Sequence, residues 1–256
     1  MPRFSAHLDY LFTDRPLLER IGAAAAAGFA AIECRFPEGV PADQFKAALA
    51  RNKVQALGIN SPTGGDGEFG FCAVPGRQDE WKKSFAEALD YVTAVGAIAI
   101  HCLAGKVDPA RRAEAETVFV ENLKRAADLA GKRNIKLYIE PINPYDLPGY
   151  FLYQVEHAAD IIAKVARPNV WLQYDFYHVQ IVGGDLIRRF ETHARIIGHV
   201  QCSQVPVRHE PDDDGEINYD FVFSEVDRLG YKGWIGAEYR PRGRTEDGLG
   251  WMKKYR

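Results

Sequence analysis

Cysteine is scarce in this sequence, with four among 256 residues and no two of them spaced as a CxxC pair. So few cysteines in so long a chain fit neither a disulfide-built scaffold nor a structural zinc clip. Long apolar stretches are also lacking, because the most apolar run covers only residues 21–32, whereas a membrane-spanning helix needs about 20 apolar residues. We therefore expect reduced thiols, a cytoplasmic location and no membrane as a partner.

An excess of positive charge is lacking as well. Lys and Arg number 32 against 35 Asp and Glu, which gives a formal net charge of −3. No overall positive field attracts a phosphate backbone, so nucleic acid is not expected as a partner. Apolar residues at 46% and charged residues at 26% are close to the globular average, which excludes disordered and fibrous classes.

What the sequence does contain is a regular alternation of short apolar runs with amphipathic stretches, the pattern of parallel βαβ units. The predicted strands cover residues 4–7, 31–34, 54–60, 98–102, 137–140, 170–175, 197–201 and 235–239. The predicted helices cover residues 15–27, 42–52, 80–95, 110–133, 154–165, 184–195 and 219–229. Eight units in 256 residues leave 32 residues for each, close to the roughly 30 that one βαβ crossover takes. We predict an α/β fold, a single (β/α)8 TIM barrel, with residues 1–256 as one domain.

One connection stands out from the others by its length and glycine content. Residues 62–75 follow the third predicted strand and contain four glycines. Long loops without secondary structure of their own are uncommon in compact domains and are often functional. We interpret this segment as a candidate lid over the site.

Each predicted strand ends on or beside a polar residue. In chain order these residues are His7, Glu33, Asn60, His101, Glu140, Asp175, Gln201 and Glu238. The carboxyl ends of all strands in a parallel barrel meet at one face, and the strands themselves are normally apolar. We therefore expect this face to carry the chemistry.

Three of the last four residues are carboxylates, and the amide oxygen of Gln201 adds a fourth oxygen. Glu140, Asp175, Gln201 and Glu238 form a donor set suited to a hard divalent cation, Mg2+ or Mn2+. The alternative is structural, since a lone Asp or Glu at a strand end often caps a helix. Four on successive strands favour a functional cluster, because converging carboxylates repel one another unless they are protonated, paired or neutralised.

Several motifs at these positions are similar to those of the hydroxypyruvate isomerases, which belong to the xylose isomerase-like barrels. The motifs are IEPIN at 139–143, DFYH at 175–178, HVQ at 199–201, VPVRHEPDDDGEINY at 205–219 and AEYRPRG at 237–243. The resemblance extends over essentially the whole chain. It implies a xylose isomerase-like TIM barrel that interconverts hydroxypyruvate and 2-hydroxy-3-oxopropanoate (tartronate semialdehyde), with a small keto acid as its substrate partner.

The resemblance also implies roles for individual residues. Glu140 and Glu238 correspond to the catalytic pair that moves a proton between neighbouring carbons through an enediolate. The metal ligands of related barrels fall on Glu140, Asp175, Gln201 and Glu238. His178 and Arg208 correspond to substrate-contacting positions, and the strand end at His101 is a further candidate substrate contact. Gln204 departs from the pattern, since Asp is expected there.

Other interpretations stay open at this point. An epimerase or isomerase of a related small keto acid or sugar, such as 2-oxo-tetronate, needs the same two glutamates. A barrel nuclease requires a His-rich zinc cluster and a basic groove, which seven histidines and a charge of −3 do not favour. A barrel kept for binding alone predicts that the two glutamates are dispensable. A homo-oligomer is compatible with any of these.

Overall fold

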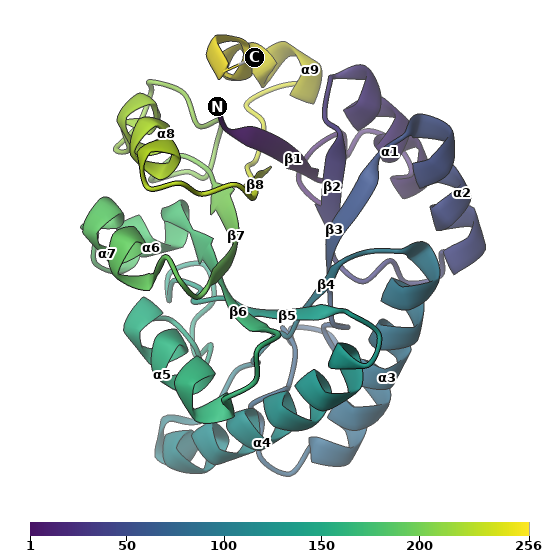
Figure 1. The fold of residues 1–256 in the computed structure, drawn as a ribbon, viewed down its shortest axis with the longest axis vertical. Helices are drawn as coiled ribbons and strands as arrows, with labels where there is room; N and C mark the ends of the chain where they lie inside the picture. Colours follow the sequence, from purple (N-terminus) through teal and green to yellow (C-terminus); the bar gives the residue numbers. More distant parts are fainter. Residues whose placement is uncertain (256) are drawn as a thin grey trace.

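The computed structural model describes residues 1–255 and contains a closed barrel of eight parallel strands. Each strand pairs with its neighbours in sequence order, and β1 pairs with β8 to close the ring (Figure 1). The strands are β1 (Arg3–His7), β2 (Ala31–Cys34), β3 (Gln55–Asn60), β4 (Ala99–His101), β5 (Lys136–Ile139), β6 (Val170–Asp175), β7 (Ile197–Cys202) and β8 (Trp234–Ala237). The predicted fold class is confirmed, and every predicted strand lies within two residues of an observed one.

Helices surround the barrel (Figure 1). They are α1 (Leu17–Ala26), α2 (Ala42–Asn52), α3 (Gln78–Val95), α4 (Arg112–Gly131), α5 (Val155–Val165), α6 (Phe176–Val182), α7 (Leu186–His193), α8 (Tyr219–Arg228) and α9 (Thr245–Gly248). Short 3-10 helices, η1 (Pro109–Arg111) and η2 (Leu249–Tyr255), precede α4 and follow α9. The seven predicted helices are confirmed, and their apolar faces pack on the strands around one continuous core.

Helix α6 is the main element that sequence periodicity does not predict. It begins directly after β6, with Asp175 as its N-cap: the Asp175 Oδ1 accepts a hydrogen bond from the Tyr177 N–H at 2.9 Å. No loop separates strand from helix, so the apolar run continues across the boundary and hides it. The short helix turns His178 back toward the strand ends, one turn after Asp175.

Two predicted strand ends lie just beyond the observed strands. Strand β5 ends at Ile139 and β8 at Ala237, so Glu140 and Glu238 are the first residues after them. Both side chains are buried. Both line a cavity at the carboxyl end of the barrel, the face on which TIM-barrel active sites lie.

The long loop at 62–75 is attached to the loop that follows β4. Gly70 forms a β-bridge with Ala104, the Cys72 N–H donates to the Leu103 carbonyl at 3.1 Å, and the Ala73 N–H donates to the Ala104 carbonyl at 2.8 Å. Phe69, from the same loop, lines a cavity at the carboxyl end of the barrel. The segment interpreted as a lid thus forms part of the wall beside the strand ends.

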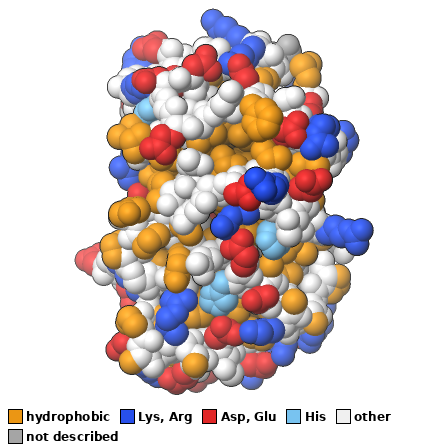
Figure 2. Space-filling view, turned by 90° about the vertical axis from the view of Figure 1, so that its left-hand side faces the viewer, with side chains coloured by type: hydrophobic (Ala, Val, Ile, Leu, Met, Phe, Trp, Pro, Cys, Tyr) orange, Lys and Arg blue, Asp and Glu red, His pale blue; other side chains and the backbone are white. Residues whose placement is uncertain are grey.

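The surface carries a mixture of charges. On the face shown in Figure 2, acidic and basic side chains of the described residues are interspersed and form no broad region of one sign. Among residues 1–255, no helix combines the length and apolar character needed to cross a bilayer.

We predict that Gly70→Ala destabilises the protein more than Gly39→Ala does. Both glycines have positive φ, at 79° and 73°. A Cβ at position 70 would lie 2.5 Å from the Leu103 carbonyl oxygen, whereas a Cβ at position 39 meets nothing within 4 Å among the described residues. Gly39→Ala should therefore lower the free energy of unfolding only by the strain of a left-handed alanine. Gly70→Ala should lower it by at least about 1 kcal/mol more. Urea unfolding of both variants measures the difference, and equal costs would contradict the fixed loop.

Candidate active site and cation site

A cavity of about 140 Å³ opens at the carboxyl end of the barrel. Six of the predicted site residues line it: His101, Glu140, His178, Gln201, Arg208 and Glu238. Asp175, the seventh, is fully buried directly behind Arg208 and His178. The folded chain thus brings the residues predicted from strands four to eight to one place.

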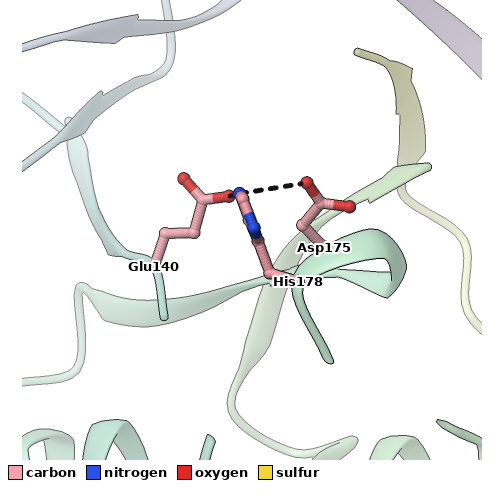
Figure 3. A group of neighbouring side chains, drawn as sticks. All are labelled: Glu140, Asp175 and His178. Atoms are coloured by element: carbon pink, nitrogen blue, oxygen red, sulfur yellow. Dashed lines mark ion pairs between the residues drawn. The ribbon is translucent and has the colours of Figure 1, made fainter. Parts of the chain in front are cut away.

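Glu140, Asp175 and His178 form a compact cluster, with one potential ligand atom from each within 4.8 Å of the others. The His178 Nε2 lies 3.7 Å from the Glu140 Oε1 and 3.6 Å from the Asp175 Oδ2. Figure 3 shows the imidazole between the two carboxylates. All three side chains are buried, so charge placed here is poorly screened by water.

The pKa values of these groups reflect that burial. Burial and the negative charges of Glu238 and Asp175 raise the pKa of Glu140 well above its usual range. Burial likewise raises the pKa of Asp175 to about 7, although the Arg208 guanidinium opposes the shift. Burial and the nearby Arg208 charge lower the pKa of His178 well below its usual value. The cluster therefore favours neutral groups unless a positive charge joins it.

Arg208 supplies one such charge from the loop after β7. Its Nη2 lies 2.9 Å from the Glu238 Oε1 and 3.4 Å from the Asp175 Oδ2. The guanidinium is held between the rings of Tyr10 and Tyr177, whose centroids are 4.8 Å and 5.0 Å away. Arg208 itself has a φ of 58°, a left-handed conformation that is costly for a residue with a Cβ. This backbone conformation places the Arg208 guanidinium between the carboxylates of Glu238 and Asp175.

A chain of side-chain hydrogen bonds runs from the barrel interior to Glu140. Burial would raise the pKa of Glu33, but His199, His7 and Ser5 lower it to about 2, so Glu33 is an anion that only accepts. It accepts from the Gln201 Nε2 at 2.8 Å, which turns the Gln201 Oε1 toward Gln173.

The Gln173 Nε2 continues the chain. It donates to the Gln201 Oε1 at 2.9 Å and to the Glu140 Oε2 at 3.0 Å. Since a carboxylate can only accept, each amide has one allowed orientation. The sequence predicts Glu33 at the carboxyl face, but the residue sits in the barrel interior and orients Gln201.

His101 is placed beside the same carboxylate. Its Nδ1 lies 3.6 Å from the Glu140 Oε2, and burial together with the charge of His7 lowers its pKa to about 3. The His101 Nε2 is buried with no hydrogen-bond partner among residues 1–255. A neutral imidazole with an unused nitrogen on a cavity wall suits a contact with a polar ligand.

Some residues of the cavity wall are not among the sequence predictions. They include Tyr10, Arg35, Phe69, Asp146 and Gln173. Gln173 lies two residues before Asp175 on β6, and the two-residue side-chain period of a strand is a signal that could have identified it. The others lie in loops, where no periodicity indicates direction.

Gln204, which departs from the family pattern, lies outside the cavity wall. Its Nε2 donates to the carbonyls of Asp212 and Ile217 at 2.8 Å and 2.9 Å, and its Oε1 accepts from the N–H groups of Val205 and Ile217. Gln204 therefore organises the loop that carries Arg208. Gln204 in place of Asp therefore changes the loop behind the site and does not change the cavity wall.

The donor set fits a hard divalent cation. Glu140 and Asp175 offer carboxylate oxygens, and the Glu140 Oε1 is buried without a hydrogen-bond partner in the described part of the chain. An orphaned buried oxygen beside a second carboxylate is the arrangement that a cation stabilises. Gln201 and Glu238 present further oxygens to the same cavity.

We predict that Asp175→Asn weakens divalent cation binding by at least about 10-fold. The amide keeps an oxygen that can cap α6 but removes one negative charge from the cluster. Calorimetric titration of EDTA-treated protein with Mn2+ measures the affinity. Asp160→Asn on the exposed face of α5 is the matched control for net charge. Equal affinities in the two variants would place the cation elsewhere.

Comparison with known proteins agrees with this geometry. The family model described as xylose isomerase-like TIM barrel matches residues 21–255. A 2-oxo-tetronate isomerase of Cupriavidus necator is 42% identical, with 100% of this chain and 99% of that protein aligned. The hydroxypyruvate isomerase of Escherichia coli is 40% identical, with both chains fully covered.

Among solved structures, a Brucella melitensis protein described as an AP endonuclease of family 2 superposes with a TM-score of 0.97 at 40% identity over the full length of both chains. The barrel topology, the site at its carboxyl end and these full-length similarities all indicate the same family. The chain belongs to the family of xylose isomerase-like TIM barrels.

Proposed function

We propose that the protein is an isomerase that interconverts hydroxypyruvate and 2-hydroxy-3-oxopropanoate. The observation that carries this proposal is the placement of Glu140 and Glu238, from the ends of β5 and β8, on one small cavity. The relative from Escherichia coli, identical at 40% of aligned positions, bears the name hydroxypyruvate isomerase.

The reaction moves one proton from C3 to C2 of the substrate and a second from the C3 oxygen to the C2 oxygen, so that the hydroxyl and carbonyl groups exchange places. One glutamate removes the C–H proton to give an enediolate, and the other delivers a proton to the neighbouring carbon. The roles exchange when the reaction runs in reverse. Arg208 pairs with Glu238 at 2.9 Å and fixes the position of that carboxylate beside the cavity.

A divalent cation, for which we propose Mg2+ with Mn2+ as the alternative, would be held by Glu140, Asp175, Gln201 and Glu238 and would act as a Lewis acid toward the enediolate oxygens. The amide chain from Glu33 keeps the Gln201 oxygen, not its nitrogen, toward the site. His101 and His178 line the wall and supply polar contacts to the substrate oxygens.

We assign the substrate carboxylate to the mouth of the cavity. Arg208 is already bonded to Glu238 and Asp175, whereas Arg35 and Arg240 line the cavity, are exposed, and form no ion pair among the described residues. Guanidinium groups bind carboxylates through charge-assisted, often bidentate hydrogen bonds. The cavity of about 140 Å³ is smaller than pockets for drug-sized ligands, which begin near 300 Å³, so it suits a short acid.

A four-carbon homologue of the same substrate is the second candidate. The relative from Cupriavidus necator carries the name 2-oxo-tetronate isomerase at 42% identity. The same glutamates would serve it, and the difference lies only in the room beyond C3. Comparing kcat/KM for hydroxypyruvate and 2-oxo-tetronate separates the two.

A nuclease activity is the alternative that the name of the Brucella melitensis protein suggests. The cluster found here holds a single histidine, and charges of both signs are interspersed on the face shown in Figure 2. A nuclease would nick DNA at abasic sites, and that assay tests the alternative. All four cysteines are free and buried, in keeping with the cytoplasmic location that we propose.

We predict that the protein catalyses deuterium exchange into hydroxypyruvate in D2O and that Glu140→Gln and Glu238→Gln each lower the rate at least about 100-fold, as expected for loss of a general acid or base. Proton NMR follows the exchange, with EDTA and added Mg2+ in separate samples. Glu87→Gln, on the exposed side of α3, is the control. Exchange that survives in both glutamine variants would overturn the mechanism and favour a binding barrel.

We predict that Arg35→Gln and Arg240→Gln raise KM for hydroxypyruvate about 10-fold and leave kcat within about twofold. The size of the change follows from the roughly 1.5–3 kcal/mol of a hydrogen bond to a charged group. Arg51→Gln, on the exposed side of α2, is the control for net charge. Dihydroxyacetone, which lacks the carboxylate, should be turned over equally by all variants. A loss in kcat with unchanged KM would argue against carboxylate recognition at these positions.

A further inference from the structure

Asn143 and His178 form a buried pair next to the site. Asn143 follows β5 by four residues, and His178 lies in the first turn of α6. The His178 Nδ1 lies 2.7 Å from the Asn143 Nδ2 and 3.3 Å from the Asn143 backbone nitrogen. Both side chains are almost completely buried, so water does not compete for these contacts.

The amide of Asn143 has one orientation. Its Oδ1 accepts from the backbone N–H groups of Tyr145 and Asp146, at 3.0 Å and 2.9 Å. Turning the amide would place its NH2 group against these two donors. The Nδ2 therefore points to His178 with a hydrogen, and the backbone N–H of Asn143 is a donor in any case. The His178 Nδ1 faces two donors and must be the acceptor.

The other ring nitrogen lies near two carboxylates and one guanidinium. The His178 Nε2 lies 3.7 Å from the Glu140 Oε1 and 3.6 Å from the Asp175 Oδ2. The Arg208 Nη2, a donor, is also 3.5 Å away, but this contact is longer than its bonds to Glu238 at 2.9 Å and Asp175 at 3.4 Å. It is also longer than the 2.7 Å contact of the Asn143 Nδ2 with the His178 Nδ1, which therefore decides the tautomer. In a neutral imidazole one nitrogen carries the hydrogen, and here that nitrogen is Nε2.

We propose that Asn143 is a positioning residue that holds His178 in the Nε2–H tautomer, so that His178 donates a hydrogen bond to a substrate oxygen in the cavity. The identity of that substrate rests on the proposed function. The same tautomer leaves no lone pair on Nε2 for a cation, which assigns cation binding to the oxygen ligands although His178 lies within the cluster. The partner of one ring nitrogen thus sets the role of the other.

The tautomer can be observed without substrate or cation. Long-range 1H–15N NMR spectra of EDTA-treated, 15N-labelled protein at neutral pH distinguish protonated from unprotonated ring nitrogens. The His178 signals are those that disappear in His178→Gln. We expect an unprotonated Nδ1 and a protonated Nε2, and a hydrogen on Nδ1 would overturn the proposal.

Two variants of Asn143 separate positioning of the imidazole from support of the loop. Asn143→Asp keeps an oxygen for the Tyr145 and Asp146 N–H groups but presents an acceptor to the His178 Nδ1. Asn143→Ala removes the loop contacts but leaves the backbone N–H as a donor to Nδ1. A positioning role predicts that Asn143→Asp moves a hydrogen onto Nδ1 and lowers kcat at least about 10-fold, and that Asn143→Ala keeps the wild-type tautomer and loses less activity.

The reverse order, with Asn143→Ala the more damaged variant in kcat and Asn143→Asp unchanged in its NMR signals, would assign Asn143 to loop support alone and overturn the proposal. Circular dichroism melting curves confirm that both variants are folded. The NMR result does not depend on activity toward hydroxypyruvate. A protein with the expected tautomer and no isomerase activity would therefore contradict the proposed function and leave the role of Asn143 in place.

Discussion

The burial of several carboxylates around one guanidinium is the constraint on which the site depends. Glu140, Asp175 and Glu238 reach the same region because parallel strands end at one face of the barrel. Burial, together with the negative charge of Glu238, raises the pKa of Asp175 to about 7 in spite of Arg208. Either protonation or added positive charge relieves this arrangement, so the electrostatics of the cluster suit a divalent cation.

Asp175 shows how one side chain can cap a helix and belong to a charged cluster at the same time. One oxygen caps α6 through the Tyr177 N–H, and the other faces Arg208 at 3.4 Å. From the sequence, helix capping and a part in a functional cluster are alternative interpretations of such a residue. The structure contains the cap together with the cluster, because a carboxylate has two oxygens and the helix begins at the strand end.

The parts of the molecule that can be predicted from the sequence are those governed by periodicity. Strand and helix periods identify the barrel, and strand ends identify Glu140, Asp175 and Glu238. Asn143 and Arg35 lie in loops after β5 and β2, where side-chain direction depends on tertiary contacts and not on a local repeat.

Glu33 is a residue whose strand can be predicted from the sequence but whose contacts cannot. The pattern places it correctly in β2, and its register opposite His7 follows from the barrel. Two of its partners, however, come from β7, which is distant in the sequence: Glu33 lies 2.9 Å from the His199 Nε2 and accepts from Gln201. These contacts exist only in the closed barrel, so the sequence alone does not predict them. The sequence pattern therefore places Glu33 at the rim, whereas the side chain lies in the barrel interior.

The glycine at position 236 makes this interior anion possible. A Cβ there would collide with the Glu33 carboxylate, and Glu33 in turn determines which end of each amide, in Gln201 and then in Gln173, faces upward. The absence of a Cβ at Gly236, in the barrel interior, thus determines which atoms of Gln201 and Gln173 face the cavity. A neutral amide in place of Glu33 would let both glutamines turn over, so that Gln201 would present nitrogen where it now presents oxygen and Gln173 the reverse.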